Sequence, residues 1–390
     1  MSTLRRAVII VVDSCGVGAA PDAADYGDLG TDTVGNTAKA VGGLSLPNLE
    51  RAGLGNLHGS ILGVPPVAEP EMAFGKLQER SAGKDSTTGH WEIAGVITEE
   101  PHATFPNGFP DDLVARLEAA TGHRFIGNYS ASGTVIIEEL GPKHLETGDP
   151  ILYTSADSVL QIATHKDVVA LTELYRICEI ARTIADDYRI GRIIARPFEG
   201  ELGAFHRTYE RHDYAMPPPG PTVLDHAKEA GLEVVGVGKI EDLFVGSGLT
   251  KAIHTEGDLD GMKATRRSIM ELDRGIVMTN LVDLDMRYGH REDPQGYAAG
   301  LALIDEHLPH IVSVLGPDDM AVITADHGTD PTDGDTNHSR EFVPLLVHAA
   351  AAAGVDLGVR LQYCDIAATV AEGLGLKAEF PGQSFLGDIA

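Results

Sequence analysis

Short apolar runs, each ending at a polar loop, alternate along much of the chain with segments whose apolar residues have helical spacing. The clearest runs cover residues 7–12, 232–237, 276–282, 320–324 and 343–347. Continuous β-branched runs of this length are typical of strands buried on both faces of a parallel sheet. Strands that alternate with helices indicate right-handed crossover connections. The pattern therefore predicts an α/β core with a mostly parallel sheet flanked by helices.

This pattern changes between about residues 101 and 217, and both crossings are rich in proline. The segment from Met216 to Pro221, MPPPGP, is the clearest linker, since stiff Pro-rich segments mark domain boundaries. A chain of 390 residues is also too long for one ordinary core. We expect a discontinuous core of residues 1–100 and 218–390 and a smaller inserted α+β domain of residues 101–217.

Composition and charge exclude several classes of protein. Hydrophobic content of 43% and charged content of 23% are those of a soluble globular protein. The net charge of -28 argues against nucleic acid as a partner. No run approaches the ~20 apolar residues of a membrane helix, and the apolar run after Arg5 and Arg6 is too short for an export signal. The three cysteines are scattered, which suits a reducing compartment and predicts a cytoplasmic protein.

Acidic and histidine side chains follow three of the predicted strands. Carboxylate oxygens and imidazole nitrogens are ligands that Mn and Zn accept, and parallel strands deliver their carboxyl ends to one edge of a sheet. Each residue alone could equally cap a helix or lie in a solvated loop. Crowded together, the carboxylates would repel one another unless cations neutralised them. We therefore predict a two-metal centre suited to phosphoryl transfer, formed by Asp13, Asp285, His290, Asp326, His327 and His338.

Two further stretches fit a reaction of phosphate. Residues 85–89, DSTTG, carry three adjacent hydroxyls, and a hydroxyl beside a metal becomes a nucleophile near neutral pH. The commoner role of such residues is to cap a helix. Arg196, Arg207 and Arg211 are a candidate clamp for an anion, because guanidinium groups bind phosphate through two parallel hydrogen bonds. The alternative is a solvated face with local ion pairs.

Seven segments together resemble one family over the whole length of the chain, the phosphopentomutases of the alkaline phosphatase superfamily. They are VVDSCGVG with PDAADYGDLGTDTVGN, GKDSTTGHWEIAGV, YTSADSVLQIA, RIIARPFEG, NLVDLDMRYGHREDPQGY and ITADHGTDPTDGDTNHSRE. The resemblance implies an alkaline-phosphatase-like core and a cap domain that closes over the sugar. It also implies transfer of phosphate between C1 and C5 of ribose or 2-deoxyribose. The reaction would use two Mn ions, a phosphorylated hydroxyl on the enzyme and a 1,5-bisphosphate intermediate.

The resemblance also assigns roles to residues of this chain. One metal would take Asp285, His290 and His338, and the other Asp13, Asp326, His327 and the nucleophile. The family usually has Thr as the nucleophile directly after the Asp of GKD, whereas this chain has Ser86, with Thr87 and Thr88 adjacent. The expected substrate-binding set is Ser155, Asp157, Arg196, Arg207, Arg211 and Lys239. The expected partners are a pentose phosphate substrate and a sugar bisphosphate activator.

Three alternatives are compatible with the same metal ligands. A metal-dependent phosphatase or sulfatase-like hydrolase could use the same core, but it would release inorganic phosphate from ribose 5-phosphate. A cofactor-independent phosphoglycerate mutase would need a site for a small carboxylate. A non-catalytic metal-binding protein would melt at a metal-dependent temperature and turn over no phosphosugar.

Overall fold

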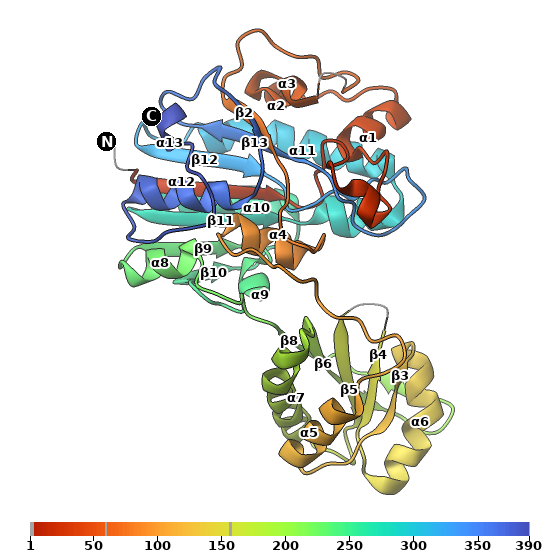
Figure 1. Cartoon of the computed structure of the whole chain (residues 1–390). Helices are drawn as coiled ribbons and strands as arrows, with labels where there is room; N and C mark the ends of the chain where they lie inside the picture. Colours follow the sequence, from red (N-terminus) through yellow and green to blue (C-terminus); the bar gives the residue numbers. More distant parts are fainter. Residues whose placement is uncertain (1–3, 59–60, 156–157, 390) are drawn as a thin grey trace. The chain divides into compact units, whose positions relative to one another are not determined.

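The computed structural model describes residues 4–58, 61–155 and 158–389. The chain forms two compact units, shown in Figure 1. One consists of residues 1–100 and 217–390, and the other, residues 101–216, is inserted within it. The chain leaves and re-enters the larger unit at Glu100–Pro101 and at Met216–Pro217.

The larger unit is built on an eight-stranded sheet with the order β10-β9-β11-β1-β12-β13-β2-β14. Strand β13 is antiparallel to both of its neighbours, and the other described pairs are parallel. The mostly parallel sheet expected from the sequence is therefore confirmed. Its strands are β1 (Arg6–Val12), β2 (Ala73–Leu77), β9 (Glu233–Val237), β10 (Lys251–Ile253), β11 (Gly275–Leu281), β12 (Asp319–Thr324), β13 (Val343–His348) and β14 (Asp356–Arg360).

Strand β1 lies at the centre of this sheet, between β11 and β12. Every residue of the three strands is buried, as expected of mostly apolar strands in the middle of a parallel sheet. The register pairs Val12 with Leu281 and Val11 with Thr324. The three carboxyl ends therefore lie side by side, and the loops that follow them leave the sheet at one edge.

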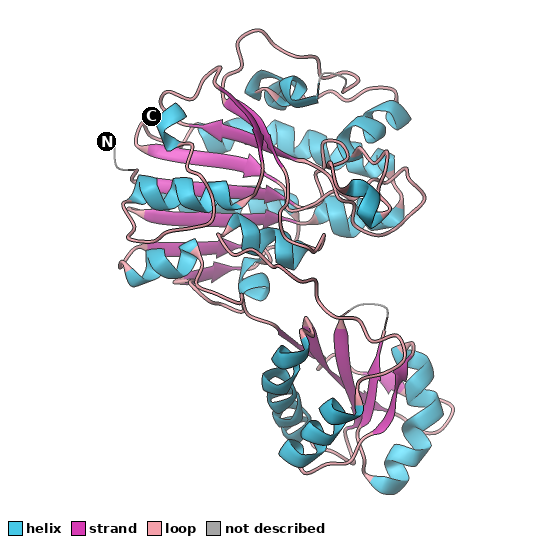
Figure 2. Cartoon of the chain, in the orientation of Figure 1, coloured by secondary structure: helices cyan, strands magenta, loops and turns pink. Residues whose placement is uncertain are grey.

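Helices cover both faces of the sheet, as Figure 2 shows. Helix α11 packs against both α1 and α10, and α12 packs against both α4 and α8. No helix among the described residues is long and apolar enough to cross a membrane. The helices of this unit are α1 (Thr33–Val41), α2 (Pro47–Ala52), α3 (Leu54–His58), α4 (Ser86–Ile93), α8 (Val223–Glu229), α9 (Ile240–Phe244), α10 (Asp258–Glu271), α11 (Pro294–Val312), α12 (Cys364–Leu374) and α13 (Leu386–Ile389).

The inserted unit has its own mixed sheet and its own apolar core. The strand order is β3-β4-β5-β6-β7, and β8 also pairs with β6. Two clusters of buried apolar side chains hold helices against this sheet. Its elements are α5 (Asp111–Thr121), β3 (Ile126–Ser130), α6 (Gly133–Thr147), β4 (Ile151–Thr154), β5 (Val159–His165), α7 (Leu171–Ala185), β6 (Arg192–Glu199), β7 (His206–Arg207) and β8 (His212–Ala215).

Three stretches of the sequence form other structures than their local pattern indicates. The strand-like sequence of residues 154–163 contains the end of β4 and the start of β5, which is antiparallel to it. Strand β6 continues through Arg196 and Pro197 instead of ending before them. Residues 349–353 form turns rather than a helix, since five small residues before a glycine are too few to sustain one. Helix α11 continues through Pro309, which lies inside its last turn.

Candidate active site

The predicted metal ligands lie where the central strands end. Asp13 follows β1, Asp326 and His327 follow β12, and Asp285 lies in a π-helical turn, Leu284–Tyr288, after β11. Such turns are rare and frequently occur at functional sites. Next to Asp13, Ser14 has a left-handed backbone with φ 71°, and its N–H donates to Asp326 Oδ1 at 3.1 Å. This turn joins the loops after β1 and β12.

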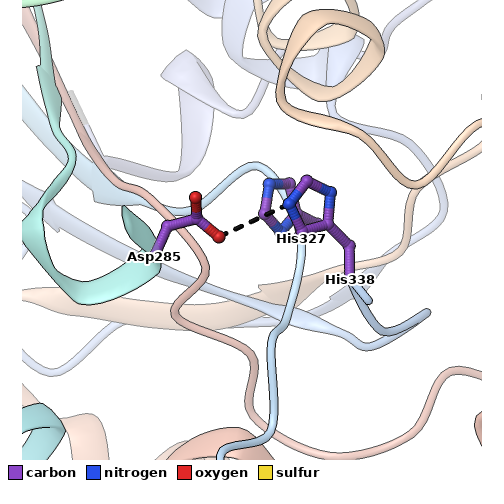
Figure 3. A group of neighbouring side chains, drawn as sticks. All are labelled: Asp285, His327 and His338. Atoms are coloured by element: carbon purple, nitrogen blue, oxygen red, sulfur yellow. Dashed lines mark ion pairs between the residues drawn. The ribbon is translucent and has the colours of Figure 1, made fainter. Parts of the chain in front are cut away.

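The structure brings five of the six predicted ligands into two groups that share His327. In each group the donor atoms all lie within 4.8 Å of one another. One group is Asp13, Asp326 and His327, and the other is Asp285, His327 and His338. Figure 3 shows Asp285 facing the rings of His327 and His338, which stack with centroids 3.8 Å apart.

The sixth predicted ligand, His290, lies beside the second group. Its Nε2 is 3.3 Å from Asp285 Oδ2 and 3.1 Å from His338 Nε2. Asp285 thus contacts both His290 and His338, since its Oδ1 is 3.4 Å from His338 Nε2. The grouping implied by the family resemblance, Asp285 with His290 and His338, is compatible with these contacts.

The partners of the three histidines orient their rings in the same way. His290 Nδ1 lies 2.6 Å from Thr336 O, His327 Nδ1 3.1 Å from Gly328 O, and His338 Nδ1 3.0 Å from Lys84 O. Because a carbonyl only accepts, each neutral ring carries its proton on Nδ1. The Nε2 lone pairs then point at carboxylates and at one another, which is unfavourable unless a cation lies between them. This set of donors fits divalent metal ions.

The carboxylates also have unused capacity to bind a cation. Asp13 Oδ1 is buried and has no hydrogen-bond partner among the described residues; His327 Nε2 lies 3.4 Å from it. Asp326 Oδ2, also buried, faces two imidazole nitrogens, His90 Nδ1 at 3.1 Å and His327 Nε2 at 3.5 Å. Buried carboxylate oxygens are normally satisfied, so the unpartnered oxygen of Asp13 favours a bound cation at this position.

Electrostatics in the cluster follow from burial and mutual contact. Burial raises the pKa of Asp13 well above its ordinary value, and the charges of Asp326 and Asp285 add to this. Burial also acts to raise the pKa of Asp285. Hydrogen bonds donated by His290 and His338, which without a metal require a proton on Nε2 as well as on Nδ1, prevail and hold that pKa well below its usual value. Burial lowers the pKa of His327 to about 4. His327 is therefore neutral at pH 7, as a metal ligand must be.

The candidate nucleophile lies directly against this cluster. Ser86 is the first residue of α4, and its Oγ is 3.1 Å from His327 Nε2. Thr88 Oγ1 instead bonds to the backbone oxygen and to the carboxylate of Asp85, both at 3.1 Å. Asp85 also caps α4 by accepting from the N–H groups of Thr87 and Thr88. Of the adjacent hydroxyls, that of Ser86 faces the candidate metal ligands, whereas that of Thr88 serves the cap.

Two residues that the sequence analysis missed tie the carboxylates together. His90, on α4, is fully buried, with Nδ1 2.8 Å from Ser86 O and 3.1 Å from Asp326 Oδ2. Its Nε2 is 3.2 Å from the amide nitrogen of Asn280, which also donates to Asp13 Oδ2 at 2.8 Å. The sequence could have indicated His90 by its position one helical turn after Ser86. Asn280 lies inside β11, where nothing in the sequence marks it as part of a site.

The predicted substrate-binding residues are spread over both units. Lys239, in the larger unit, is exposed at the start of α9, and its charge acts to lower the pKa of Asp13. Ser155, in the inserted unit, follows β4 and is half-buried. Asp157 lies outside the described residues.

The three predicted arginines lie together in the inserted unit. Arg196, Arg207 and Arg211 line a cavity of about 470 Å³ with Pro197, Thr208 and Tyr209. Arg211 pairs with Asp213 at 2.5 Å, and Arg196 Nε donates to Gln161 at 3.0 Å. Burial lowers the pKa of Arg196, and the positive charges of Arg211 and Arg207 add to this. Mutually repelling guanidinium groups around a cavity favour binding of an anion.

Comparison with known proteins agrees with this geometry. Residues 5–378 match the family model of the metalloenzyme superfamily. The phosphopentomutase of Anaeromyxobacter dehalogenans (strain 2CP-C) is 54% identical over 99% of this chain and 98% of its own length. That of Desulfitobacterium hafniense (strain DSM 10664 / DCB-2) is 52% identical over 99% of this chain and 100% of its own.

Among solved structures, the PH0037 protein from Pyrococcus horikoshii has a similar fold. The two superimpose with a TM-score of 0.50 at 15% sequence identity, covering 98% of this chain and 100% of that protein. Similarity at this level of identity concerns the fold and not the reaction.

Proposed function

Because this chain belongs to the phosphopentomutases of the metalloenzyme superfamily, we propose that its Asp–His cluster interconverts the 1- and 5-phosphates of ribose or 2-deoxyribose. As a member of this family it is an isomerase that acts on a small phosphosugar. The observation that carries the proposal is the convergence of three imidazole Nε2 atoms and three carboxylates beside Ser86 Oγ.

The cluster holds two divalent cations in this proposal, and we assign them as Mn. One is held by Asp285, His290 and His338, and the other by Asp13, Asp326 and His327. When bound, the cations neutralise the carboxylates and stabilise the charge of the transferring phosphoryl group. Asp13 Oδ1, which has no hydrogen-bond partner among the described residues, and the Nδ1–H tautomers of the histidines support this assignment.

Ser86 carries the phosphoryl group between the two positions of the sugar. The C1 hydroxyl of the 5-phosphate attacks the phosphorus of phospho-Ser86, so that a new P–O bond forms while the bond to Ser86 Oγ breaks. The hydroxyl proton passes to the leaving Ser86 oxygen, and the product is the 1,5-bisphosphate. The Ser86 oxygen then attacks the 5-phosphoryl group, its proton passes to the leaving C5 oxygen, and the sugar 1-phosphate is released while the phosphoenzyme is regenerated. No water is consumed, and the site must exclude water to prevent hydrolysis.

The remaining groups recognise the substrate. Arg196, Arg207 and Arg211 bind its phosphate or hydroxyl oxygens, with Ser155, Asp157 and Lys239 as further polar contacts. The net charge of -28 repels a sugar phosphate at long range. The positive side chains of this set attract it locally. A sugar bisphosphate activator would supply the first phosphoryl group to Ser86. We place this reaction in the cytoplasm.

Intact-mass measurement after incubation with a pentose 1,5-bisphosphate and Mn tests the assignment of Ser86. The wild-type protein should gain one phosphoryl group, and Ser86→Ala should gain none and lose isomerase activity. Thr87→Val is the matched control, because it removes the neighbouring hydroxyl and should still be phosphorylated. A phosphoryl group that persists in Ser86→Ala would place the nucleophile elsewhere.

A further inference from the structure

The tripeptide Ser339-Arg340-Glu341 follows the candidate ligand His338 and has no role in the reaction described above. All three side chains are nearly or fully buried. Arg340 and Glu341 point to different parts of the site, as neighbouring side chains of an extended segment do. Arg340 contacts the segment that leads to the nucleophile, and Glu341 contacts the loops that carry the metal ligands.

Arg340 holds the segment that leads to Ser86. Its Nη1 donates to Ser81 O at 2.8 Å and to Gly83 O at 2.7 Å. Between them, Ala82 O accepts from Tyr26 at 3.0 Å, and the guanidinium of Arg340 lies 4.8 Å over the ring of Tyr26.

The next carbonyl along the chain, that of Lys84, accepts from His338. Four successive carbonyls, from Ser81 to Lys84, are thus fixed by side chains from elsewhere in the sequence. The segment has no helix or strand to hold it, so these contacts determine where Asp85 and Ser86 begin α4.

The charge of Arg340 is compensated by two carboxylates. It pairs with Glu79 at 2.7 Å and with Asp22 at 3.0 Å. Burial acts to lower the pKa of Arg340, but the nearby carboxylates prevail and raise it. Because the guanidinium has five donors in a fixed plane, it can pair with these carboxylates and bond to the carbonyls at the same time, which a lysine ammonium cannot.

Glu341 holds the loops after β1 and β12. Its Oε2 accepts from Gly18 N at 3.1 Å and from Thr33 N at 3.0 Å. Its Oε1 accepts from Thr33 Oγ1 at 2.6 Å and from Ser339 Oγ at 2.7 Å. All four partners donate, so both oxygens must act as acceptors.

The same carboxylate packs against two glycines of these loops. A Cβ on Gly16 would lie 2.2 Å from Glu341 Oε2, and one on Gly328 would lie 2.5 Å from Oε1. Gly16 follows Asp13 by three residues, and Gly328 follows His327 directly. Only glycine lets the ligand loops approach Glu341 this closely.

Thr33 extends this network to the second group of candidate ligands. Its Oγ1 donates to Glu341 and accepts from Thr329 N at 3.1 Å. Thr329 Oγ1 in turn lies 3.3 Å from Asp285 Oδ1. The network from Glu341 thus reaches loops that carry ligands from both groups.

We propose that Arg340 and Glu341 are positioning residues with separate tasks, Arg340 for the nucleophile Ser86 and Glu341 for the metal ligands. The proposal rests on the function assigned above. Loss of a residue that holds a metal ligand in place lowers metal affinity about ten- to hundred-fold. Displacement of a reacting group by about 1 Å can lower the rate about a hundred-fold.

The test compares two conservative variants of the full chain by two measurements. Mn affinity is measured by calorimetry on the metal-free protein. The rate of phosphorylation by a pentose 1,5-bisphosphate at saturating Mn is measured by intact mass. Arg340→Lys should slow phosphorylation about ten-fold or more and leave the Mn affinity within about two-fold. Glu341→Gln should weaken Mn binding about ten-fold or more, with near-normal phosphorylation once Mn saturates the site.

Matched controls come from side chains with the same kinds of contact outside the site. Arg360 also pairs with a buried carboxylate, Asp365, donates to a backbone carbonyl and lies over an aromatic ring. Asp305 also accepts from backbone N–H groups, those of Asn48 and Leu49. Arg360→Lys and Asp305→Asn should change neither measurement. Thr33→Val removes one hydrogen bond to Glu341 and leaves the carboxylate in place. It should weaken Mn binding, as Glu341→Gln does, but by less.

Two outcomes would overturn the proposal. One is that Arg340→Lys and Glu341→Gln alter both quantities equally, or neither, relative to their controls. The other is that Thr33→Val binds Mn as the wild type does. If instead the wild-type protein itself gains no phosphoryl group, the proposed function fails, and this result is distinct from either outcome.

Discussion

The two candidate sites of this chain carry opposite charges. The Asp–His cluster of the larger unit is built on carboxylates, whereas the arginine cavity of the inserted unit is lined by guanidinium groups. In the cluster, Asp13, Asp326 and His327 are at most 2% exposed, and Asp13 Oδ1 has no hydrogen-bond partner among the described residues. In the cavity, Arg207 is exposed, and no described residue forms a hydrogen bond or ion pair with its side chain. The first site needs added cations before it can accept a phosphate, whereas the second carries its cations permanently.

This difference predicts different consequences of substitution. Each group in the cluster is held by neighbours that are themselves fixed, as Asp326 is by Ser14 N and His90. A change there should affect metal binding and the rate of the reaction together. The arginine side chains contact few neighbours, so a change there should affect mainly the affinity for the substrate.

Asp326→Ala should have the largest effect, because Asp326 is fully buried and belongs to one of the candidate metal groups. Loss of metal-ion stabilisation is worth several kcal/mol, so we expect kcat/KM to fall by about 10³-fold or more. Steady-state assay of ribose 5-phosphate formation from ribose 1-phosphate checks this. Retention of more than a tenth of the activity at saturating Mn would remove Asp326 from the reaction.

Removal of metal should lower the stability of the protein. A ligand that binds only the folded state at 100 times its Kd adds about 2.7 kcal/mol per site. The melting temperature of chelator-treated protein should therefore rise when Mn is added back. Arg207→Ala should show the same rise, since Arg207 belongs to the other site. A melting temperature independent of Mn would argue against bound metal.

Arg207→Ala should raise KM with little change in kcat. A hydrogen bond to a charged group contributes about 1.5–3 kcal/mol, which corresponds to roughly ten- to hundred-fold in KM. Arg207→Lys should restore part of the affinity, because lysine keeps the charge but not the planar fork. A fall in kcat at unchanged KM would instead place Arg207 in the chemical step.

Asp258→Asn should change how stability depends on pH. Asp258 is buried beside Asp283, and burial raises the pKa of its carboxyl to about 7. Because this folded pKa lies above the unfolded value, the group favours folding at low pH and loses that contribution as pH rises from about 4 to about 7. Its slope is at most about 1.4 kcal/mol per pH unit.

Denaturant unfolding of the metal-free protein and of the variant at pH 5 and pH 8 measures this contribution. The asparagine variant should gain stability relative to the wild type as pH rises. An equal difference at both pH values would contradict the raised pKa.

The sequence predicted the candidate ligands because each follows a strand with an unmistakable apolar pattern. Once β1, β11 and β12 were recognised as parallel, Asp13, Asp285 and Asp326 had to leave the sheet at one edge. Strand β2 was missed because its sequence, AFGKL, contains a glycine and a lysine that break the apolar run. Helix α6 was missed because it begins at a glycine, Gly133, and contains a proline, Pro142, and both residues disfavour helices.

The supporting network could not be predicted because it depends on contacts between distant parts of the chain. Arg340 reaches Ser81 and Gly83 across more than 250 positions. Asn280 lies in an apolar strand and contacts Asp13 only because β11 neighbours β1. The spacing of residues in the sequence carries no record of such contacts, whereas strand ends can be read from local patterns.

Anomalous diffraction from crystals of the protein grown with Mn tests most directly whether the Asp–His cluster holds two cations beside Ser86. We predict two Mn peaks, one at Asp13, Asp326 and His327 and one at Asp285, His290 and His338, with Ser86 Oγ next to the first. A single peak, or Mn bound away from these side chains, would contradict the account.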